Sequence, residues 1–182
     1  MSDAFDVVAP ELKTARLRLC PLSVDDAPAI YAYTSDAEVA RFTLWAAHPN
    51  EDFTRGFLAT LIGPAVLAWS VALDEPHTII GMIFLHSLSR QHRKAELAFS
   101  LRRSFWRRGI TTEAAAEVLK FAFGELNLNR AEATCMRGNH GSRRVLEKLG
   151  MSLEGTMRRS HFRYDGFHDM DLFSILRDEN RG

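Results

Sequence analysis

Residues 99–113 read FSLRRSFWRRGITTE, and this stretch decides which fold the chain can form. A strand pattern ends near Leu101, a basic turn containing Gly109 follows, and an amphipathic helix begins after it. The first turn of a helix leaves amide donors unpaired at the positive end of its dipole. A glycine lets a ligand approach the backbone closely. The stretch therefore predicts a site for a phosphate or pyrophosphate.

The turn is also strongly basic, which favours an anion as its ligand. Its four arginines are Arg102, Arg103, Arg107 and Arg108. The alternative interpretation is a solvated basic turn before an amphipathic helix, and the turn alone does not separate the two. It contains neither Gly-x-x-x-x-Gly-Lys nor Gly-x-Gly-x-x-Gly, which excludes a P-loop and a dinucleotide fingerprint here.

Strand patterns dominate the sequence before this turn. Apolar residues alternate with polar or small ones over residues 16–20, 67–73 and 95–101. Residues 79–85 are nearly all apolar, as in a strand that is buried on both faces. The polar residues 87–94 predict a loop, so the last three strands in this series are expected to form an antiparallel meander.

Helical patterns lie on both sides of these strands. They begin at Ser23, Asp36 and Asn50, and again after Gly109 and at Asn139. The longest has an apolar stripe from Ala115 to Leu126, and Thr111 or Thr112 is expected to cap it. A weaker strand over residues 130–136 follows it, and the segments 154–162 and 169–176 predict a hairpin through Asp165-Gly166.

These elements predict one domain, because no repeat, low-complexity segment or linker interrupts them. Strands flanked by helices are typical of a three-layer α/β (α+β) domain with a mixed sheet. The first residues lack periodicity, so we expect a flexible arm over residues 1–13 and the domain over residues 14–178.

The overall charge is balanced, since Lys plus Arg and Asp plus Glu number 23 each. Non-specific binding to nucleic acid or to an anionic membrane needs a basic excess, so we expect neither partner.

The N-terminus lacks a signal-peptide pattern and no apolar stretch approaches the ~20 residues that span a bilayer, which favours a cytoplasmic protein. Cys20 and Cys135 predict two reduced thiols, and no residue set has the spacing of a zinc site, so we expect no metal.

Several motifs in order give the chain a resemblance to a known family. Residues 14–19, TARLRL, resemble a Thr-x-Arg-Leu-x-Leu start, and residues 95–99 resemble a fourth strand. Residues 106–111 fall on the acyl-CoA motif Gln/Arg-x-x-Gly-x-Gly/Ala, and residues 139–151 are similar to Asn-x-x-Ser-x-x-Val-Leu-x-Lys-Leu-Gly-Phe. These motifs resemble the GNAT (Gcn5-related N-acetyltransferase) superfamily, in particular its RimJ/RimL branch of ribosomal-protein N-terminal acetyltransferases.

The resemblance implies a central sheet of about seven strands, mostly antiparallel, with helices on both faces and a splay between strands four and five. It also implies that acetyl-CoA binds in this splay. The backbone of Phe99, Ser100 and Leu101 would pair with the pantetheine arm, and Asn139 would bond this arm or order the adjacent loop. The residues implied at the pyrophosphate are Trp106, Arg107, Arg108, Gly109, Ile110, Thr111 and Thr112.

Three residues are candidates for the chemistry, each with a structural alternative. Ser142 lies where the branch places a hydroxyl near the thioester sulfur, although it is also a plausible helix cap. Glu96 lies where many members have a carboxylate that could act as a base through water, although a solvent-facing strand carboxylate explains it as well. His161 lies near the position of another catalytic carboxylate, and histidine titrates near neutral pH. A water molecule is the remaining candidate for the base.

The resemblance therefore implies an N-acetyltransferase that moves an acetyl group from acetyl-CoA to a primary amine. A protein N-terminal α-amine is the leading acceptor and a small amine the next, and a homodimer is expected. The alternative is an acyl-CoA-binding sensor or interaction module with the same fold and no turnover. This sequence departs from the acyl-CoA motif at two positions. Trp106 replaces Gln/Arg, although Trp is usual for the branch, and Thr111 replaces the final Gly/Ala.

Overall fold

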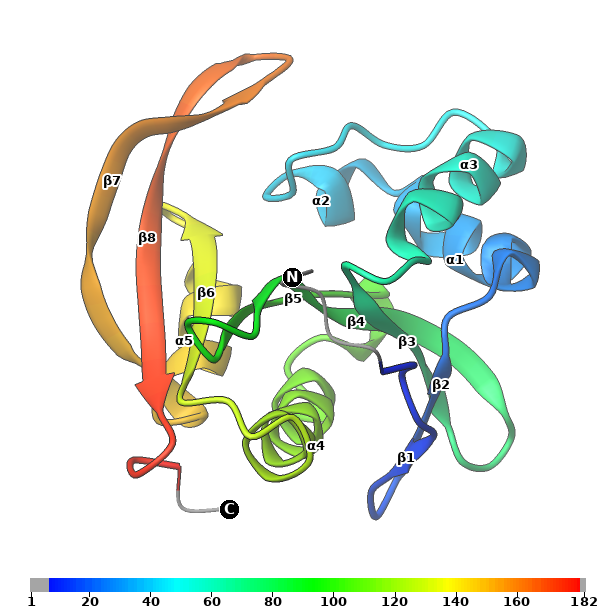
Figure 1. Cartoon of the computed structure of the whole chain (residues 1–182). Coiled ribbons are helices and arrows are strands. Elements are labelled where there is room, and N and C mark those ends of the chain that lie inside the picture. Colours follow the sequence, from blue (N-terminus) through cyan, green and yellow to red (C-terminus); the bar gives the residue numbers. More distant parts are fainter. Residues whose placement is uncertain (1–6, 181–182) are drawn as a thin grey trace.

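The computed structural model describes residues 7–180 and shows one domain built around an eight-stranded sheet (Figure 1). The strand order is β1-β2-β3-β4-β5-β6-β8-β7, and only the β5–β6 pair is parallel. The strands are β1 (Leu12–Lys13), β2 (Leu17–Pro21), β3 (Leu67–Leu73), β4 (Thr78–Ser89), β5 (Lys94–Leu101), β6 (Arg130–Met136), β7 (Ser152–Arg163) and β8 (Gly166–Leu176). The predicted mixed, mostly antiparallel sheet is confirmed, with one short strand more than expected.

Five α-helices cover the two faces of the sheet, which confirms the three-layer prediction (Figure 1). They are α1 (Ala27–Thr34), α2 (Ala37–Ala40), α3 (Glu51–Leu61), α4 (Ile110–Gly124) and α5 (His140–Lys148), and short 3-10 turns precede α1 and α4. Ser23, Asp36, Asn50 and Asn139 each cap a following helical segment through a side-chain oxygen, as the sequence predicts.

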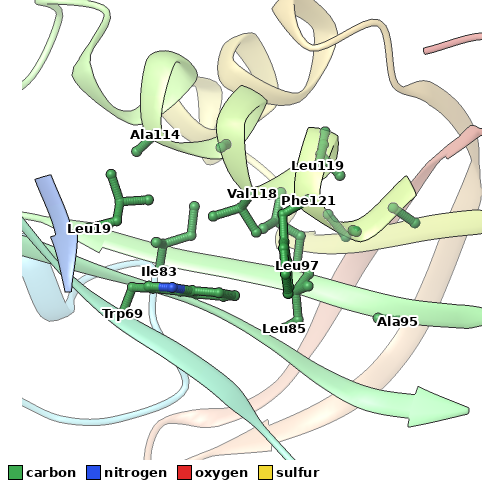
Figure 2. Packing of buried hydrophobic residues seen from close by; sticks show 14 of the residues in the cluster. Leu19, Trp69, Ile83, Leu85, Ala95, Leu97, Ala114, Val118, Leu119 and Phe121 are labelled. Carbon is green, nitrogen blue, oxygen red and sulfur yellow. The ribbon is translucent and has the colours of Figure 1, made fainter. Parts of the chain in front are cut away.

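The main core lies between α4 and the sheet (Figure 2). Val118 and Leu119 of α4 are fully buried, and full burial of such a side chain stabilises a fold by about 1.5–3 kcal/mol. The rings of Trp69 on β3 and Phe121 on α4 pack edge to face, with their centres 5.8 Å apart. A second core joins α1 and α3 to the opposite face of the sheet through residues such as Ile30 and Leu58. The two cores fix the sheet from both sides.

The segment before β2 is attached to the domain although no periodic pattern reveals it. Leu12 and Lys13 pair with Leu19 and Arg18 of β2, and the Trp69 indole donates a hydrogen bond of 2.6 Å to the carbonyl of Pro10. A strand of two residues is too short to produce a sequence period. Part of the arm predicted over residues 1–13 is therefore packed on the sheet, while residues 1–6 lie outside the described part.

Two local predictions are wrong, and both errors concern the ends of elements. Gly109, not Thr111 or Thr112, is the N-cap of α4, because its left-handed backbone (φ 76°) lets the helix begin at once at Ile110. The loop predicted over residues 87–94 is shorter, because β4 continues to Ser89, which pairs with Lys94 after a register shift. A strand bulge of this kind leaves no signal in a polar sequence.

A buried histidine holds the loop between α2 and α3 in place. His48 is 3% exposed, and its ring lies about 5 Å from the rings of Trp45, Phe53 and Phe57. Its Nδ1 lies 2.9 Å from the hydroxyl of Thr54, whereas its Nε2 finds no partner among the described residues. This burial lowers the pKa of His48 below the ordinary value of a histidine.

We expect His48 to make the stability of the fold depend on pH. Below about pH 6.5 an unfolded histidine takes up a proton, whereas buried His48 takes one up only at lower pH, so the free energy of unfolding falls as the pH drops. The measurement is the urea midpoint at about pH 7.5 and about pH 5.5. His48→Gln should show a smaller difference than the wild type. His77→Gln, at an exposed position, is the control, and equal differences in all three proteins would refute this role.

Candidate active site

The sheet opens between β5 and β6, and this opening organises the site. The β5–β6 ladder of the described residues has three residue pairs, and the last of them joins Glu96 to Glu132. Beyond Glu96 the two strands diverge, which confirms the predicted splay. The predicted strands four and five are β5 and β6 here, because the short β1 was not among the predicted strands. Phe99 to Leu101 therefore keep β4 as a partner on one side and have no strand on the other. Free backbone groups on a strand edge can pair with an extended ligand.

The predicted anion turn lies at the open end of this splay, between β5 and α4. Arg107 and Gly109 both have left-handed backbones, with φ of 62° and 76°. Helix α4 starts at Ile110, so the amides of Ile110, Thr111 and Thr112 belong to its first turn and lack intrahelical acceptors. The departure at Thr111 thus falls inside the helix, where its backbone amide remains a donor. This arrangement fits a pyrophosphate at the helix dipole.

Side chains around the turn fix its entrance. The Trp106 indole donates a hydrogen bond of 2.7 Å to the carbonyl of Leu101, so the chain leaves β5 in a fixed direction.

On β4, a Cβ at Gly81 would lie 2.6 Å from the carbonyl oxygen of Ser100, and only glycine permits this approach of the two strands. The Arg103 guanidinium is committed to Asp36 at 3.3 Å. Arg108 lies 5.3 Å from the centre of the Phe105 ring.

Asn139 and Ser142 meet at the start of α5. The Ser142 amide donates to Oδ1 of Asn139 at 3.1 Å, and Nδ2 of Asn139 donates to the Ser142 hydroxyl at 3.0 Å. Asn139 is therefore the helix cap, and the Ser142 hydroxyl accepts its bond while keeping its own proton to donate. A hollow of about 260 Å³ lies beside this helix start.

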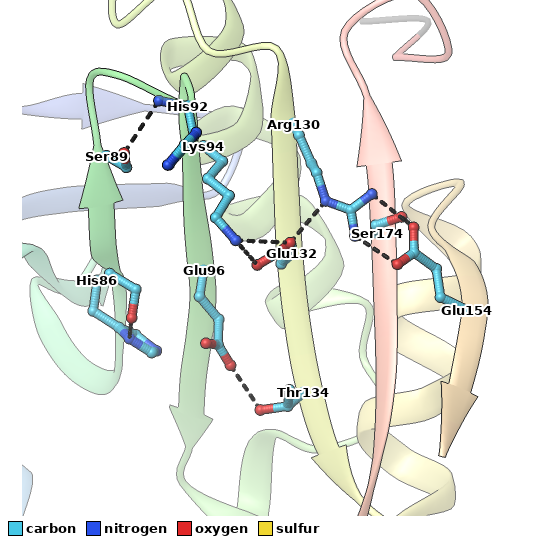
Figure 3. A network of polar contacts seen from close by, with 11 residues as sticks. His86, Ser89, His92, Lys94, Glu96, Arg130, Glu132, Thr134, Glu154 and Ser174 are labelled. Carbon is cyan, nitrogen blue, oxygen red and sulfur yellow. Dashed lines mark hydrogen bonds and ion pairs between the residues drawn. The ribbon is translucent and has the colours of Figure 1, made fainter. Parts of the chain in front are cut away.

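Glu96 lies at the closed end of the splay and contacts both strands (Figure 3). The Thr134 hydroxyl of β6 donates a hydrogen bond of 2.7 Å to Oε1 of Glu96. The neighbours Ala95 and Leu97 point into the core under α4, so Glu96 lies on the face that carries α1 and α3. His86 of β4 is its cross-strand partner, which places both side chains on the same face.

An ion-pair network holds the closed end together next to Glu96 (Figure 3). Lys94 lies 3.2 Å from Glu132, and Arg130 bonds Glu132 at 2.8 Å and both oxygens of Glu154 at 2.6 Å. The bonds from Arg130 and Ser174 lower the pKa of Glu154 to about 2. Bidentate arginine–carboxylate pairs fix geometry as well as adding energy. The network therefore links β5 to β6 and reaches across β8 to Glu154 of β7, and Glu96 follows directly after it.

His161 lies away from the groups around Glu96. It pairs with His168 near the turn of the β7–β8 hairpin, and its Nδ1 lies 3.0 Å from the Ser160 hydroxyl. Across the sheet, Glu96 pairs with Glu132 of β6, which in turn pairs with Ser174 of β8. Ser174 is six residues from His168, which is about 20 Å along a strand. The structure thus brings Glu96 to the splay and leaves His161 on the hairpin.

Sequence reasoning missed two residues that support the splay. Thr134 orients Glu96 but shows no signal, because a threonine in a strand is ordinary. Tyr33 of α1 is 1% exposed, and its hydroxyl lies 3.2 Å from the hydroxyl of Ser100. Burial raises the pKa of Tyr33, so its hydroxyl stays neutral and holds α1 against β5. A buried tyrosine needs a partner for its hydroxyl, but the sequence does not reveal which one.

Among residues 7–180, no group of three or more His, Cys, Asp or Glu side chains is placed to hold a metal ion. Within the same residues, no helix is long and apolar enough to cross a bilayer.

Comparison with known proteins identifies the family. The family model of the acetyltransferase (GNAT) domain matches residues 16–152 of this sequence. The uncharacterized N-acetyltransferase YoaA of Bacillus subtilis is 28% identical over 172 residues, which are 92% of this chain and 97% of the relative. The chain belongs to the GNAT acetyltransferase family, and it is an acyl-CoA-dependent N-acetyltransferase.

Other relatives carry names that mention an acceptor. The putative ribosomal N-acetyltransferase YdaF of Bacillus subtilis is 36% identical over 105 residues, 58% of this chain and 57% of the relative. The spermidine N(1)-acetyltransferase of Escherichia coli K12 is 24% identical over 156 residues, 84% of this chain and 81% of the relative. These two names disagree on the acceptor.

Solved structures share the fold. A GNAT-family acetyltransferase of Bacillus anthracis superposes with a TM-score of 0.85 at 29% identity, covering 93% of this chain and 100% of the other. The microcin C7 self-immunity acetyltransferase MccE, solved with acetyl-CoA and AMP, has a TM-score of 0.80 at 16% identity, covering 90% and 93%. GNAT enzymes use acetyl-CoA and an amine acceptor, and the turn and splay described above are compatible with the first of these.

Proposed function

We propose that this enzyme transfers an acetyl group from acetyl-CoA to a protein N-terminal α-amine, as RimJ/RimL-type ribosomal-protein acetyltransferases do, with a small primary amine as the second candidate. The observation that carries the proposal is the splay, which leads from the turn at Gly109 to the carboxylate of Glu96. The ordered motifs of the branch and the partial match to YdaF support the N-terminal acceptor. An enzyme with this acceptor would act in the cytoplasm.

The cofactor would follow the splay from one end to the other. Its pantetheine arm would pair with the backbone of Phe99 to Leu101, and the amides from Arg107 to Thr112 would hold its pyrophosphate. Arg107 and Arg108 would add charge around the phosphates. This placement brings the thioester toward the closed end of the splay, near Glu96.

Glu96 would act as the base, directly or through a water molecule. An aliphatic ammonium must lose a proton before its nitrogen attacks the thioester carbonyl. One proton of the ammonium passes to Glu96, and the neutral nitrogen forms the C–N bond. As the C–S bond breaks, the second proton lost by the nitrogen ends on the departing sulfur, so that CoA leaves as the thiol. The Ser142 hydroxyl would donate to the departing sulfur, since its own proton is free while its oxygen accepts from Asn139. His161 is the alternative base, and its place on the hairpin makes it the weaker candidate.

Titration calorimetry tests the cofactor part of this proposal. We expect acetyl-CoA to bind with a Kd in the range of micromolar to tens of micromolar, and CoA to bind at the same site. A protein that shows no heat of binding at tens of micromolar acetyl-CoA would contradict the assignment of the splay.

Mass spectrometry tests the acceptor. The enzyme and isotope-labelled acetyl-CoA are incubated with a cell extract, and acetylated products are sought among both proteins and small amines. Label on protein N-termini supports the first acceptor, and label on a polyamine supports the second. Binding of acetyl-CoA without any labelled product would favour the sensor. Light scattering of the purified protein tests the predicted homodimer.

A further inference from the structure

The back of the anion turn is held by a segment from the beginning of the chain. Thr14 and Arg16 lie just before β2, about one hundred residues from Glu113 in the first turns of α4. Nε of Arg16 donates a hydrogen bond of 2.7 Å to Oε2 of Glu113, and the Thr14 hydroxyl donates one of 2.5 Å to Oε1. The Arg16 amide also donates to Oε1 at 3.1 Å. We call these three residues the clasp.

The clasp reaches the turn itself through the arginine. Both terminal nitrogens of Arg16 donate to the carbonyl oxygen of Arg108, each at 3.3 Å. The nearest atom to a Cβ built on Gly109 is again a terminal nitrogen of Arg16, at 3.8 Å. Arg16 therefore contacts the peptide that joins Arg108 to Gly109.

This contact fixes the direction of a donor. In a trans peptide the C=O and N–H bonds point in opposite directions. Because Arg16 holds the oxygen of the Arg108–Gly109 peptide, the amide of Gly109 points away from Arg16. Glu113 in turn fixes Arg16 relative to α4, so this amide and the amides of the first helical turn keep one relative orientation.

Charge does not explain the clasp. Burial tends to raise the pKa of Glu113, but the hydrogen bonds from Thr14 and Arg16 outweigh it, and the net pKa lies below the ordinary value. Glu113 is therefore a carboxylate at neutral pH, and it cancels the charge of Arg16 at 2.6 Å. A pair without net charge adds little field for an anion. The clasp therefore contributes to anion binding by fixing the geometry of the turn.

We propose that Thr14, Arg16 and Glu113 are positioning residues that preorganise the pyrophosphate turn, so that the segment before β2 is part of the cofactor site without touching the cofactor. This inference rests on the proposed function of the turn. Preorganised donors bind a ligand without reordering, and a misplacement of about 1 Å far from the reacting atoms can cost about 100-fold.

The test is the affinity for acetyl-CoA in Arg16→Met and Glu113→Gln. We expect the Kd and KM for acetyl-CoA to rise by about ten-fold in each variant, while kcat at saturating acetyl-CoA stays within about two-fold. The double variant should lose no more than the worse single variant, because both substitutions open the same clasp. The salt dependence of binding should be that of the wild type, since no residue that contacts a phosphate is removed.

A matched control separates the clasp from general stability. Arg55 has a similar exposure and a similar ion pair, with Glu51 at 3.3 Å, but lies on α3. Arg55→Met should leave the Kd unchanged. If Arg16→Met does not fold, Thr14→Val and Glu113→Gln replace it, because each removes less of the clasp.

The outcomes distinguish this inference from the proposed function. A wild type that does not bind acetyl-CoA overturns the proposed function. A wild type that binds, together with clasp variants of unchanged Kd, overturns only the clasp. Additive losses in the double variant, or an equal loss of kcat, would also overturn it, because they would assign the two residues separate or catalytic roles.

Discussion

Glu96→Gln is expected to lower kcat/KM at neutral pH by at least about 100-fold, within the 10²–10⁴ range that general bases contribute. The amide of glutamine cannot take a proton from the amine. Its carbonyl oxygen still accepts the hydrogen bond from Thr134, which spans 2.7 Å in the wild type, so the splay should keep its geometry. The Kd for acetyl-CoA should therefore stay unchanged. The measurement is release of CoA with the acceptor found by mass spectrometry.

The pH profile makes this prediction sharper. The loss in Glu96→Gln should shrink as the pH rises toward the pKa of the amine, because solvent then supplies the neutral nucleophile. Glu125→Gln, which changes an exposed carboxylate, serves as the control and should retain wild-type rates. A large loss in His161→Gln combined with wild-type rates in Glu96→Gln would instead assign the base to the hairpin.

The fold could be predicted from the sequence wherever a pattern is local. The stripe of α4 and the cap at Asn139 each depend on a few consecutive residues. The cap of α4 could not be predicted in the same way. Thr111 and Thr112 are common cap residues, and nothing local shows that the left-handed Gly109 has already begun the helix.

The site was predictable only in part, because its contacts join distant segments. Glu96 could be named from its motif, whereas Thr134 meets it only through the parallel register of β5 and β6. Arg16 and Glu113 each belong to a recognisable motif, yet their contact depends on how β2 lies beside α4. Periodicity reports which face is buried, and it carries no information on which polar side chains meet across the sheet.

Gly109→Val is expected to weaken acetyl-CoA binding by at least about 100-fold, or about 2.7 kcal/mol. Gly109 has φ 76°, a region that β-branched residues strongly avoid, and it opens α4 as the N-cap. Valine would move the turn out of this conformation and displace the amides that follow. Space inside the protein is not the obstacle, since a Cβ there meets only Arg16 at 3.8 Å. Calorimetry with acetyl-CoA measures the effect.

The strain of a left-handed valine must be separated from the loss of the site. Gly166 has φ 126° in the β7–β8 turn and open space around it, so Gly166→Val carries backbone strain without touching the splay. It should lower the melting temperature and leave the Kd for acetyl-CoA unchanged. Gly109→Ala should fall between the wild type and Gly109→Val, because alanine tolerates the left-handed region at a cost of about 1–2 kcal/mol. Wild-type affinity in Gly109→Val would remove the pyrophosphate from this turn, and the splay would then need another entrance for its ligand.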